Sequence, residues 1–300
     1  MRETKILVAI GFCVKNEEDT IRDAIESVAR QDFPHECLEM IFVSDGSTDG
    51  TLQIIKECVS KIDIRAKVFH TDWRGLGQAR QTVVENASGD YIVFVDGDCR
   101  LSTNYISKQI DVMRRYPTVG IASGLFGICQ GDNCVATLEN VNYVVSRLKH
   151  KGKMTSNLIS TAGSIMRVAA LKQVGGFDPE IRRSQEDIDV AYRLKRAGWR
   201  SYITDAVFYH RFRRTWKALW RQHFSYGYGL HFLLSKNKGQ NPLRDKSVDR
   251  ILFSSQAYKL TGKKMVFLLP LNFVFKKIAL VCGFLAAHAD GYGHQSDNDQ

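Results

Sequence analysis

Apolar and polar positions alternate in two different ways along the first hundred residues of the chain. Continuous apolar runs predict buried strands at residues 6–12, 38–44, 65–70 and 91–95. Between these runs, apolar residues recur at three- and four-residue spacing over residues 21–29 and 52–59, which predicts amphipathic helices. Strands that alternate with helices indicate an α/β fold with a mostly parallel central sheet flanked by helices.

The alternation becomes less regular after residue 100. The spacing of apolar residues predicts helices near residues 103–116 and 135–149, with a strand over 119–128 between them. A further helix is expected to begin near residue 185 and to end near Gly198.

Residues 265–289 form an apolar segment that is interrupted by Pro270, Asn272 and the pair Lys276-Lys277. Each apolar half is too short to span a bilayer. We therefore expect this segment to lie on a membrane surface rather than to cross the membrane. The alternative is a helical face that packs on protein or forms a dimer.

Composition and charge narrow the choice of partner only in part. The 300 residues are 44% hydrophobic and 25% charged, which is ordinary for a globular protein. The net charge of +10 favours anionic partners such as nucleotide phosphates, nucleic acid or acidic lipid headgroups. The seven cysteines form no Cys-x-x-Cys pair, so a reduced, cytoplasmic environment fits best.

The fourth predicted strand runs directly into Asp96-Gly97-Asp98. Carboxylate oxygens at the end of a strand suit Mn²⁺ or Mg²⁺, ions that also bind substrate phosphates. The alternative is a hairpin turn, because Asp-Gly is a common turn dipeptide. His210 follows another apolar run and is a candidate further ligand, although a single histidine in that position is usually structural.

Charged residues also follow the other predicted strands. Asp45 ends the second strand and could accept hydrogen bonds from a nucleobase, and Glu17 follows the first strand at the same sheet edge. The alternative for the segment 44–51 is a turn that caps the next helix. Arg80, near the start of the third helix, could bind a pyrophosphate or uracil group, or could belong to an ordinary basic helix start.

Glu186 and Asp187 open the helix expected to end near Gly198. Acidic residues in a first turn stabilise a helix through its dipole, and this can be their whole role. The functional alternative makes Asp187 a general base that takes a proton from an acceptor hydroxyl.

Taken in chain order, these segments resemble family 2 glycosyltransferases of the GT-A fold. The matching segments are Val14-Lys15-Asn16-Glu17-Glu18, Ser44 to Thr51, Gly75 to Arg80, Asp96-Gly97-Asp98, Gly163 to Arg167, Gly175-Gly176-Phe177-Asp178 and Glu186-Asp187. The resemblance covers about residues 5–235. It implies transfer of a sugar from a nucleotide sugar with inversion at the anomeric carbon.

The resemblance also implies a role for each candidate residue. The nucleotide would be bound by Cys13, Val14, Glu17, Asp45, Arg80 and Asp96. Asp98 would bind a divalent cation, Mn²⁺ or Mg²⁺, together with Asp96 and His210. Asp187 would be the catalytic base. The donor and acceptor sugars would lie beside Gly163, Ser164 and Glu186.

Two departures from the family pattern affect this interpretation. Cys13 and Val14 replace the Pro-Thr that commonly precedes the Asn-Glu pair, which makes the nucleobase contacts less certain. The Gln-x-x-Arg-Trp signature of processive synthases is absent, and Arg221-Gln222-His223 occupies a comparable place. We therefore expect addition of one sugar per encounter rather than extrusion of a polymer.

The expected organisation is a GT-A catalytic domain over residues 1–235, with a nucleotide half to about 100 and an acceptor half beyond it. A helical region over 236–289, in contact with an anionic membrane at its cytoplasmic face, and a disordered tail over 290–300 would follow. The expected partners are a UDP or GDP sugar and a glycan, glycolipid or polyprenyl-phosphate acceptor, and not nucleic acid. Two alternatives stay open: a nucleotidyltransferase that makes a nucleotide sugar, and a non-enzymatic basic module on a membrane.

Overall fold

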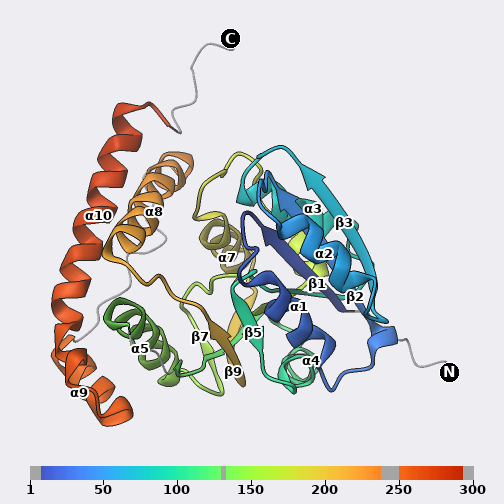
Figure 1. Cartoon of the computed structure of the whole chain (residues 1–300), viewed down its shortest axis with the longest axis horizontal. Coiled ribbons are helices and arrows are strands. Elements are labelled where there is room, and N and C mark those ends of the chain that lie inside the picture. The colour runs from blue at the N-terminus through green and yellow to red at the C-terminus, as the bar shows by residue number, and fades with distance from the viewer. Residues whose placement is uncertain (1–7, 130–132, 238–249, 293–300) are drawn as a thin grey trace.

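The structure is a computed structural model that describes residues 8–129, 133–237 and 250–292. A single mixed sheet runs through the molecule, with helices on both faces (Figure 1). Its strands lie in the order β3-β2-β1-β4-β8-β6-β9-β5, and β7 pairs with β9. The strands are β1 Val8–Val14, β2 Leu38–Asp45, β3 Arg65–Thr71, β4 Tyr91–Phe94, β5 Cys99–Leu101, β6 Val119–Phe126, β7 Lys153–Thr155, β8 Ser164–Arg167 and β9 Arg200–His210.

The first four strands confirm the predicted parallel arrangement. β1 pairs in parallel with both β2 and β4, and β2 pairs in parallel with β3. The second half differs, because β8 runs antiparallel to β4 and β6, and β5 and β7 run antiparallel to β9. β6 and β9 pair in parallel, so the sheet is mixed rather than uniformly antiparallel in its second half. The predicted α/β fold is confirmed, with more antiparallel pairing than expected.

Helices cover the sheet in two layers. The helices are α1 Ile21–Ala29, α2 Thr51–Val59, α3 Leu76–Asn86, α4 Tyr105–Arg115, α5 Cys134–Leu148, α6 Val168–Gln173, α7 Glu186–Arg196, α8 Trp216–Lys236, α9 Arg250–Thr261 and α10 Leu269–Ala289. Buried residues of α1, α2 and α4 pack against one face, and those of α3, α6 and α7 pack against the other. Alternate residues of β1 supply both cores, because successive side chains of a strand point to opposite faces.

The C-terminal helices form a separate layer at the edge of the molecule opposite β3 (Figure 1). α10 packs along α8, and the two backbones approach closely where Gly227 faces the Leu280 carbonyl and Gly283 faces the Phe224 carbonyl. The interrupted segment predicted as two apolar halves is thus one helix, preceded by a 3₁₀ turn at Lys264–Leu268. Pro270 lies in the first turn of α10, where its missing N–H costs nothing, so it begins the helix rather than breaking it.

The predicted end of the catalytic domain and the predicted disordered tail both lie near this layer. Helix α8 lies within the predicted catalytic domain but packs on α10. Residues 290–292 of the predicted disordered tail have defined contacts, since the Tyr228 hydroxyl donates to the Asp290 carboxylate at 3.0 Å and the Tyr292 ring packs on the Tyr228 ring. Residues 293–300 lie outside the described residues.

Candidate active site

The parallel strands β1, β2 and β4 end at the same edge of the sheet and bring the predicted carboxylates together there. Gly97 allows this convergence, because a Cβ at this position would lie 3.0 Å from Glu17 Cγ and 3.1 Å from Val14 Cγ1. The chain after β1 can therefore approach the chain after β4. A side chain at position 97 would push Glu17 away from the two aspartates.

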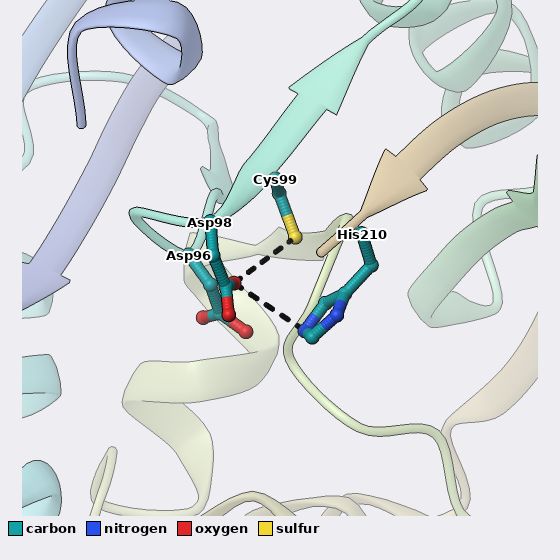
Figure 2. A group of neighbouring side chains, drawn as sticks. All are labelled: Asp96, Asp98, Cys99 and His210. Carbon is teal, nitrogen blue, oxygen red and sulfur yellow. Dashed lines mark hydrogen bonds and ion pairs between the residues drawn. The ribbon is translucent and has the colours of Figure 1, made fainter. Parts of the chain in front are cut away.

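His210 reaches the same edge through strand pairing. Cys99 of β5 lies opposite His210 of β9, and the His210 Nε2 atom is 3.4 Å from Asp98 Oδ1. One ligand atom each from Asp96, Asp98, Cys99 and His210 lies within 4.8 Å of the others, and Figure 2 shows these side chains pointing toward a common point. The strand order thus joins two segments that lie far apart in the sequence.

The electrostatics of this cluster fit a cation. Burial and the neighbouring Asp98 carboxylate raise the pKa of Glu17 to about 7. Burial also raises the pKa of Asp98; nearby His210 lowers it and Asp96 raises it. Among the residues that the structure describes, the buried Nδ1 atom of His210 finds no hydrogen-bond partner. Crowded carboxylates beside an imidazole are a ligand set that suits Mn²⁺ or Mg²⁺, so the residues fit the predicted ion.

Cys99 lies in the cluster but is a poor ligand. Burial, together with the Asp96 and Asp98 carboxylates, raises the pKa of its thiol well above the ordinary value. Only a thiolate binds a metal well, and Mn²⁺ and Mg²⁺ favour oxygen ligands, so Cys99 is a weaker candidate ligand than the carboxylates.

Asp45 holds the loop that follows β3. Its Oδ1 accepts the Arg74 N–H at 2.6 Å and its Oδ2 accepts the Gly75 N–H at 2.8 Å. Gly75 has φ +102° and lies against the backbone of Arg182, so glycine is required there. The carboxylate predicted to bind a nucleobase therefore shapes the wall of the pocket in this structure, and its contact with a base stays a prediction.

The outer wall of this pocket carries an aromatic residue that the sequence analysis did not single out. The Trp73 side chain is 47% exposed, and the Lys15 ammonium lies 5.1 Å from the centre of its ring. Trp73 borders a hollow of about 280 Å³ together with Arg74 and Arg182. Cys13 lies near the end of β1, where burial raises the pKa of its thiol to about 12, so the thiol is neutral.

Arg80 connects three parts of the site. Its guanidinium forms an ion pair with the Glu186 carboxylate and lies 3.6 Å from Asp96 Oδ1. The side chains of Arg80 and Glu186 are 7% and 3% exposed. Arg80 and Glu186 therefore pair with each other in this structure, and contact of Arg80 with a nucleotide or of Glu186 with a sugar stays a prediction.

Asp187 is the second residue of α7 and lies beside this ion pair. Burial raises the pKa of its carboxyl group, and the nearby Arg80 guanidinium lowers it. Gln185, the residue before α7, has a left-handed backbone with φ +78°, which is uncommon for a residue other than glycine. Its side chain donates to the Tyr226 carbonyl at 3.2 Å, so α8 helps to hold the turn that presents Asp187.

The predicted sugar-binding residues Gly163 and Ser164 are both hydrogen-bonded inside the protein. Gly163, with φ +60°, lies beside the end of β4, because its N–H donates to the Phe94 carbonyl at 3.1 Å. Ser164 is completely buried and its hydroxyl donates to the Ser160 carbonyl. The Ser164 side chain is thus occupied inside the protein, and the Gly163 carbonyl accepts hydrogen bonds from the Tyr105 and Ser123 hydroxyls. Contact of either residue with a sugar stays a prediction.

Two further residues belong to the site. Tyr226 is half-buried, and its pKa is raised by burial of the hydroxyl and by the nearby Tyr143 and Asp187. Arg213 lies close enough to Glu17 and Asp98 to lower the pKa of both. Arg213 follows the candidate ligand His210 by three positions, which is the sequence signal that could have identified it.

Comparison with known proteins identifies the family. A family model described as "Glycosyl transferase family 2" matches residues 10–175. The chain belongs to glycosyltransferase family 2. The resemblance inferred from the ordered motifs is thereby confirmed.

The family 2 chain is similar to several bacterial enzymes. It is 25% identical over 227 residues to the poly-beta-1,6-N-acetyl-D-glucosamine synthase of Staphylococcus epidermidis, a match that covers 74% of this chain and 54% of the synthase. It is 27% identical over 203 residues to the putative teichuronic acid biosynthesis glycosyltransferase TuaG of Bacillus subtilis, covering 67% of this chain and 77% of TuaG. The chain spans only about half the length of the synthase.

Solved structures confirm the fold. The mannosyltransferase PcManGT of Pyrobaculum calidifontis, in complex with GDP-Man and Mn²⁺, superposes with a TM-score of 0.68 at 16% identity, covering 95% of this chain and 88% of PcManGT. Residues 1–349 of the TarS protein of Staphylococcus aureus give a TM-score of 0.54 at 18% identity, covering 94% of this chain and 83% of that structure. The predicted GT-A architecture is therefore correct for this family 2 chain.

Proposed function

We propose that this chain is an inverting, metal-dependent glycosyltransferase that moves one sugar from a UDP or GDP sugar to an acceptor hydroxyl or phosphate. The observation that carries the proposal is the pairing of β5 with β9, which sets His210 beside Asp98 at the sheet edge where Asp187 also lies. A charged ligand cluster and a separate buried carboxyl group are the two functions that inverting transfer requires.

The proposed binding mode follows the charges of the site. The nucleoside lies against Cys13, Val14 and the loop held by Asp45, with Trp73 available for stacking on a base. The diphosphate lies between the Asp98–His210 cluster and Arg213, whose guanidinium faces the same carboxylates. A bound Mn²⁺ or Mg²⁺ would offset the negative charge of the diphosphate as it leaves.

Asp187 acts on the acceptor in this proposal. Its carboxylate accepts the hydroxyl proton while the acceptor oxygen forms a bond to the anomeric carbon, and the bond to the nucleoside diphosphate breaks on the opposite face. Attack opposite the departing group inverts the configuration. Arg80 helps to keep Asp187 ionised, because a nearby cation favours the charged form of a carboxyl group.

The acceptor and the number of sugars added are also proposals. The names of the relatives refer to polymers of N-acetylglucosamine and to teichuronic acid, so a glycan-type acceptor in the cytoplasm and UDP-N-acetylglucosamine as donor are the first candidates. The Gln-x-x-Arg-Trp signature is absent, and Gln222 instead donates to the Tyr226 hydroxyl at 3.0 Å. We therefore propose addition of single sugars.

A donor screen tests the proposal. Purified protein with Mn²⁺ is incubated with a set of UDP and GDP sugars, with and without candidate glycan acceptors, and both nucleoside diphosphate and pyrophosphate are measured. We expect slow, EDTA-sensitive release of UDP or GDP from one donor, accelerated by the acceptor. Release of pyrophosphate would instead identify a nucleotidyltransferase, and the absence of metal-dependent nucleotide binding would favour the non-enzymatic module.

A further inference from the structure

Helix α10 presents an apolar face to the outside of the molecule. The outer apolar stripe consists of Phe267, in the 3₁₀ turn before the helix, and of Leu271, Val274, Ile278, Val281 and Leu285 of α10. Their exposed fractions lie between 50% and 67%. The spacing alternates between three and four residues, so the side chains lie on one side of the helix. Figure 1 shows α10 as the outermost element at this edge, with α8 between it and the sheet.

The polar residues that interrupt this segment in the sequence face inward. Asn272 is 1% exposed, and Lys276 is 9% exposed with its ammonium 2.7 Å from Glu139 on α5. A helix on the surface of a water-soluble protein normally has the opposite arrangement, with apolar residues inside and polar residues outside. The outer surface of α10 is therefore more apolar than its linear sequence suggests, and it forms a contiguous patch of the kind that marks an interaction site.

The charge around the stripe is of one sign. The sequence from residue 250 to residue 289 contains lysine and arginine but no aspartate or glutamate, and the same is true from 206 to 237. Lys264 and Lys277 are exposed beside the stripe. Trp216 of α8 is 43% exposed and packs its ring on Phe275. Basic residues and tryptophan at the border of an apolar face match the headgroup region of an anionic bilayer.

This charge distribution favours a lipid bilayer over a second copy of the chain as the partner of the stripe. In a dimer formed through α10, the lysines of one copy would face those of the other with no carboxylate on either helix to pair with them. Anionic lipid headgroups supply the missing negative charge, and the long lysine side chains can reach them while the apolar stripe enters the acyl boundary.

We propose that the outer apolar stripe docks on the surface of an anionic lipid bilayer, with α10 lying in the plane of the membrane. By length and composition alone, Lys264–Ala289 could cross a membrane, and it is the one such helix among the residues that the structure describes. Its inner face, however, is fixed to the protein through the Lys276–Glu139 ion pair and through the close approach of Gly283 to α8. The docking does not depend on the proposed reaction. A lipid-linked acceptor would meet the enzyme at this surface, and that suggestion does rest on the proposed function.

Vesicle flotation of the full chain tests the proposal. Vesicles of phosphatidylcholine alone are compared with vesicles that also contain phosphatidylglycerol. We expect the wild type to float with the anionic vesicles, and the double variant Ile278→Gln/Leu285→Gln to bind them at least about tenfold more weakly, since each lost apolar contact weakens partitioning. The matched control Ile128→Gln/Leu148→Gln changes two exposed apolar residues of the same types outside the stripe, at 45% and 40% exposure, and should float like the wild type. Lys277→Gln should weaken binding to anionic vesicles only.

Two results would overturn the proposal. One is equal flotation of the stripe variant and the wild type, or no flotation of either. The other is a concentration-dependent dimer in sedimentation velocity that the stripe variant abolishes while neither protein binds vesicles, which would assign the stripe to a second copy of the chain. Thermal melting and binding of UDP with Mn²⁺ show whether each variant is folded, and exposed stripe residues should leave both unchanged.

Discussion

Arg80 on helix α3 and Glu186 on helix α7 form an ion pair whose side chains are 7% and 3% exposed. The pair joins two helices on the same face of the sheet. It also holds the Arg80 guanidinium beside Asp96 and Asp187. Taking two charges out of water is costly, and their mutual attraction must offset that cost. Removing one partner should therefore affect the protein far more than removing one partner of an exposed pair.

The substitution Glu186→Ala tests this expectation. It leaves the Arg80 guanidinium buried near Asp96, at 3.6 Å, and near Asp187, without the carboxylate that pairs with it most closely. We expect the free energy of unfolding to fall by about 3–5 kcal/mol, measured by urea denaturation. The control Glu57→Ala breaks the Arg22–Glu57 pair, whose side chains are 43% and 41% exposed, and should cost at most about 1 kcal/mol. Similar small losses in both variants would show that the buried pair contributes little.

His210 is predicted to be a ligand rather than a structural histidine. The substitution His210→Ala removes the only imidazole of the cluster among the described residues. Loss of a group that merely supports a ligand costs about 10–100-fold in metal affinity, so loss of the ligand itself should cost at least that. Titration calorimetry with Mn²⁺ and UDP measures the change. The control His35→Ala removes a histidine that pairs with Asp63 at the surface, and it should bind Mn²⁺ like the wild type. If the affinity of His210→Ala for Mn²⁺ were unchanged, His210 would have a structural role only.

The pH dependence of transfer should report the raised pKa of Asp187. Only the ionised carboxylate can accept the acceptor proton, and burial moves ionisation to a higher pH than the ordinary value of 3.8. The rate should therefore fall as the pH falls through that raised pKa, which places the acid limb of the kcat profile above pH 3.8.

The variant Asp187→Asn provides the control for that profile. We expect its rate to be lower by about 10²–10⁴-fold, because general base catalysis is lost, and its residual activity to lack this acid limb. Binding of UDP with Mn²⁺ should persist, since Asp187 is not part of the ligand cluster. An acid limb that stays in place in Asp187→Asn would assign it to another group.

The sheet edge could be predicted from sequence because its signals are local. Asp45 and Asp96 directly follow apolar runs, and the parallel order of those strands places their ends together. His210 could be proposed as a ligand from its chemistry, but its approach to Asp98 depends on the antiparallel pairing of β5 with β9. No periodicity in either short segment encodes that pairing.

Contacts between distant helices could not be predicted in the same way. Arg80 and Glu186 each have a sufficient local explanation as part of a helix start, and only the packing of α3 beside α7 joins them. The C-terminal segment shows the same limit. Asn272 and Lys276 interrupt the apolar run in the sequence, whereas in the structure both are buried and Lys276 pairs with Glu139. A linear pattern cannot say which side of a helix is covered.

The close approach of α8 and α10 yields the last prediction, for Gly227→Ala. In an ordinary helix, replacing glycine by alanine stabilises by about 1 kcal/mol, because alanine loses less backbone entropy on folding. At position 227 the added Cβ would overlap the Leu280 carbonyl, which belongs to backbone and cannot move aside. We expect a loss of about 1–3 kcal/mol in the free energy of unfolding, measured by urea denaturation. Because helix propensity and steric overlap predict opposite signs, a stabilised Gly227→Ala variant would show that the two helices are not packed as described.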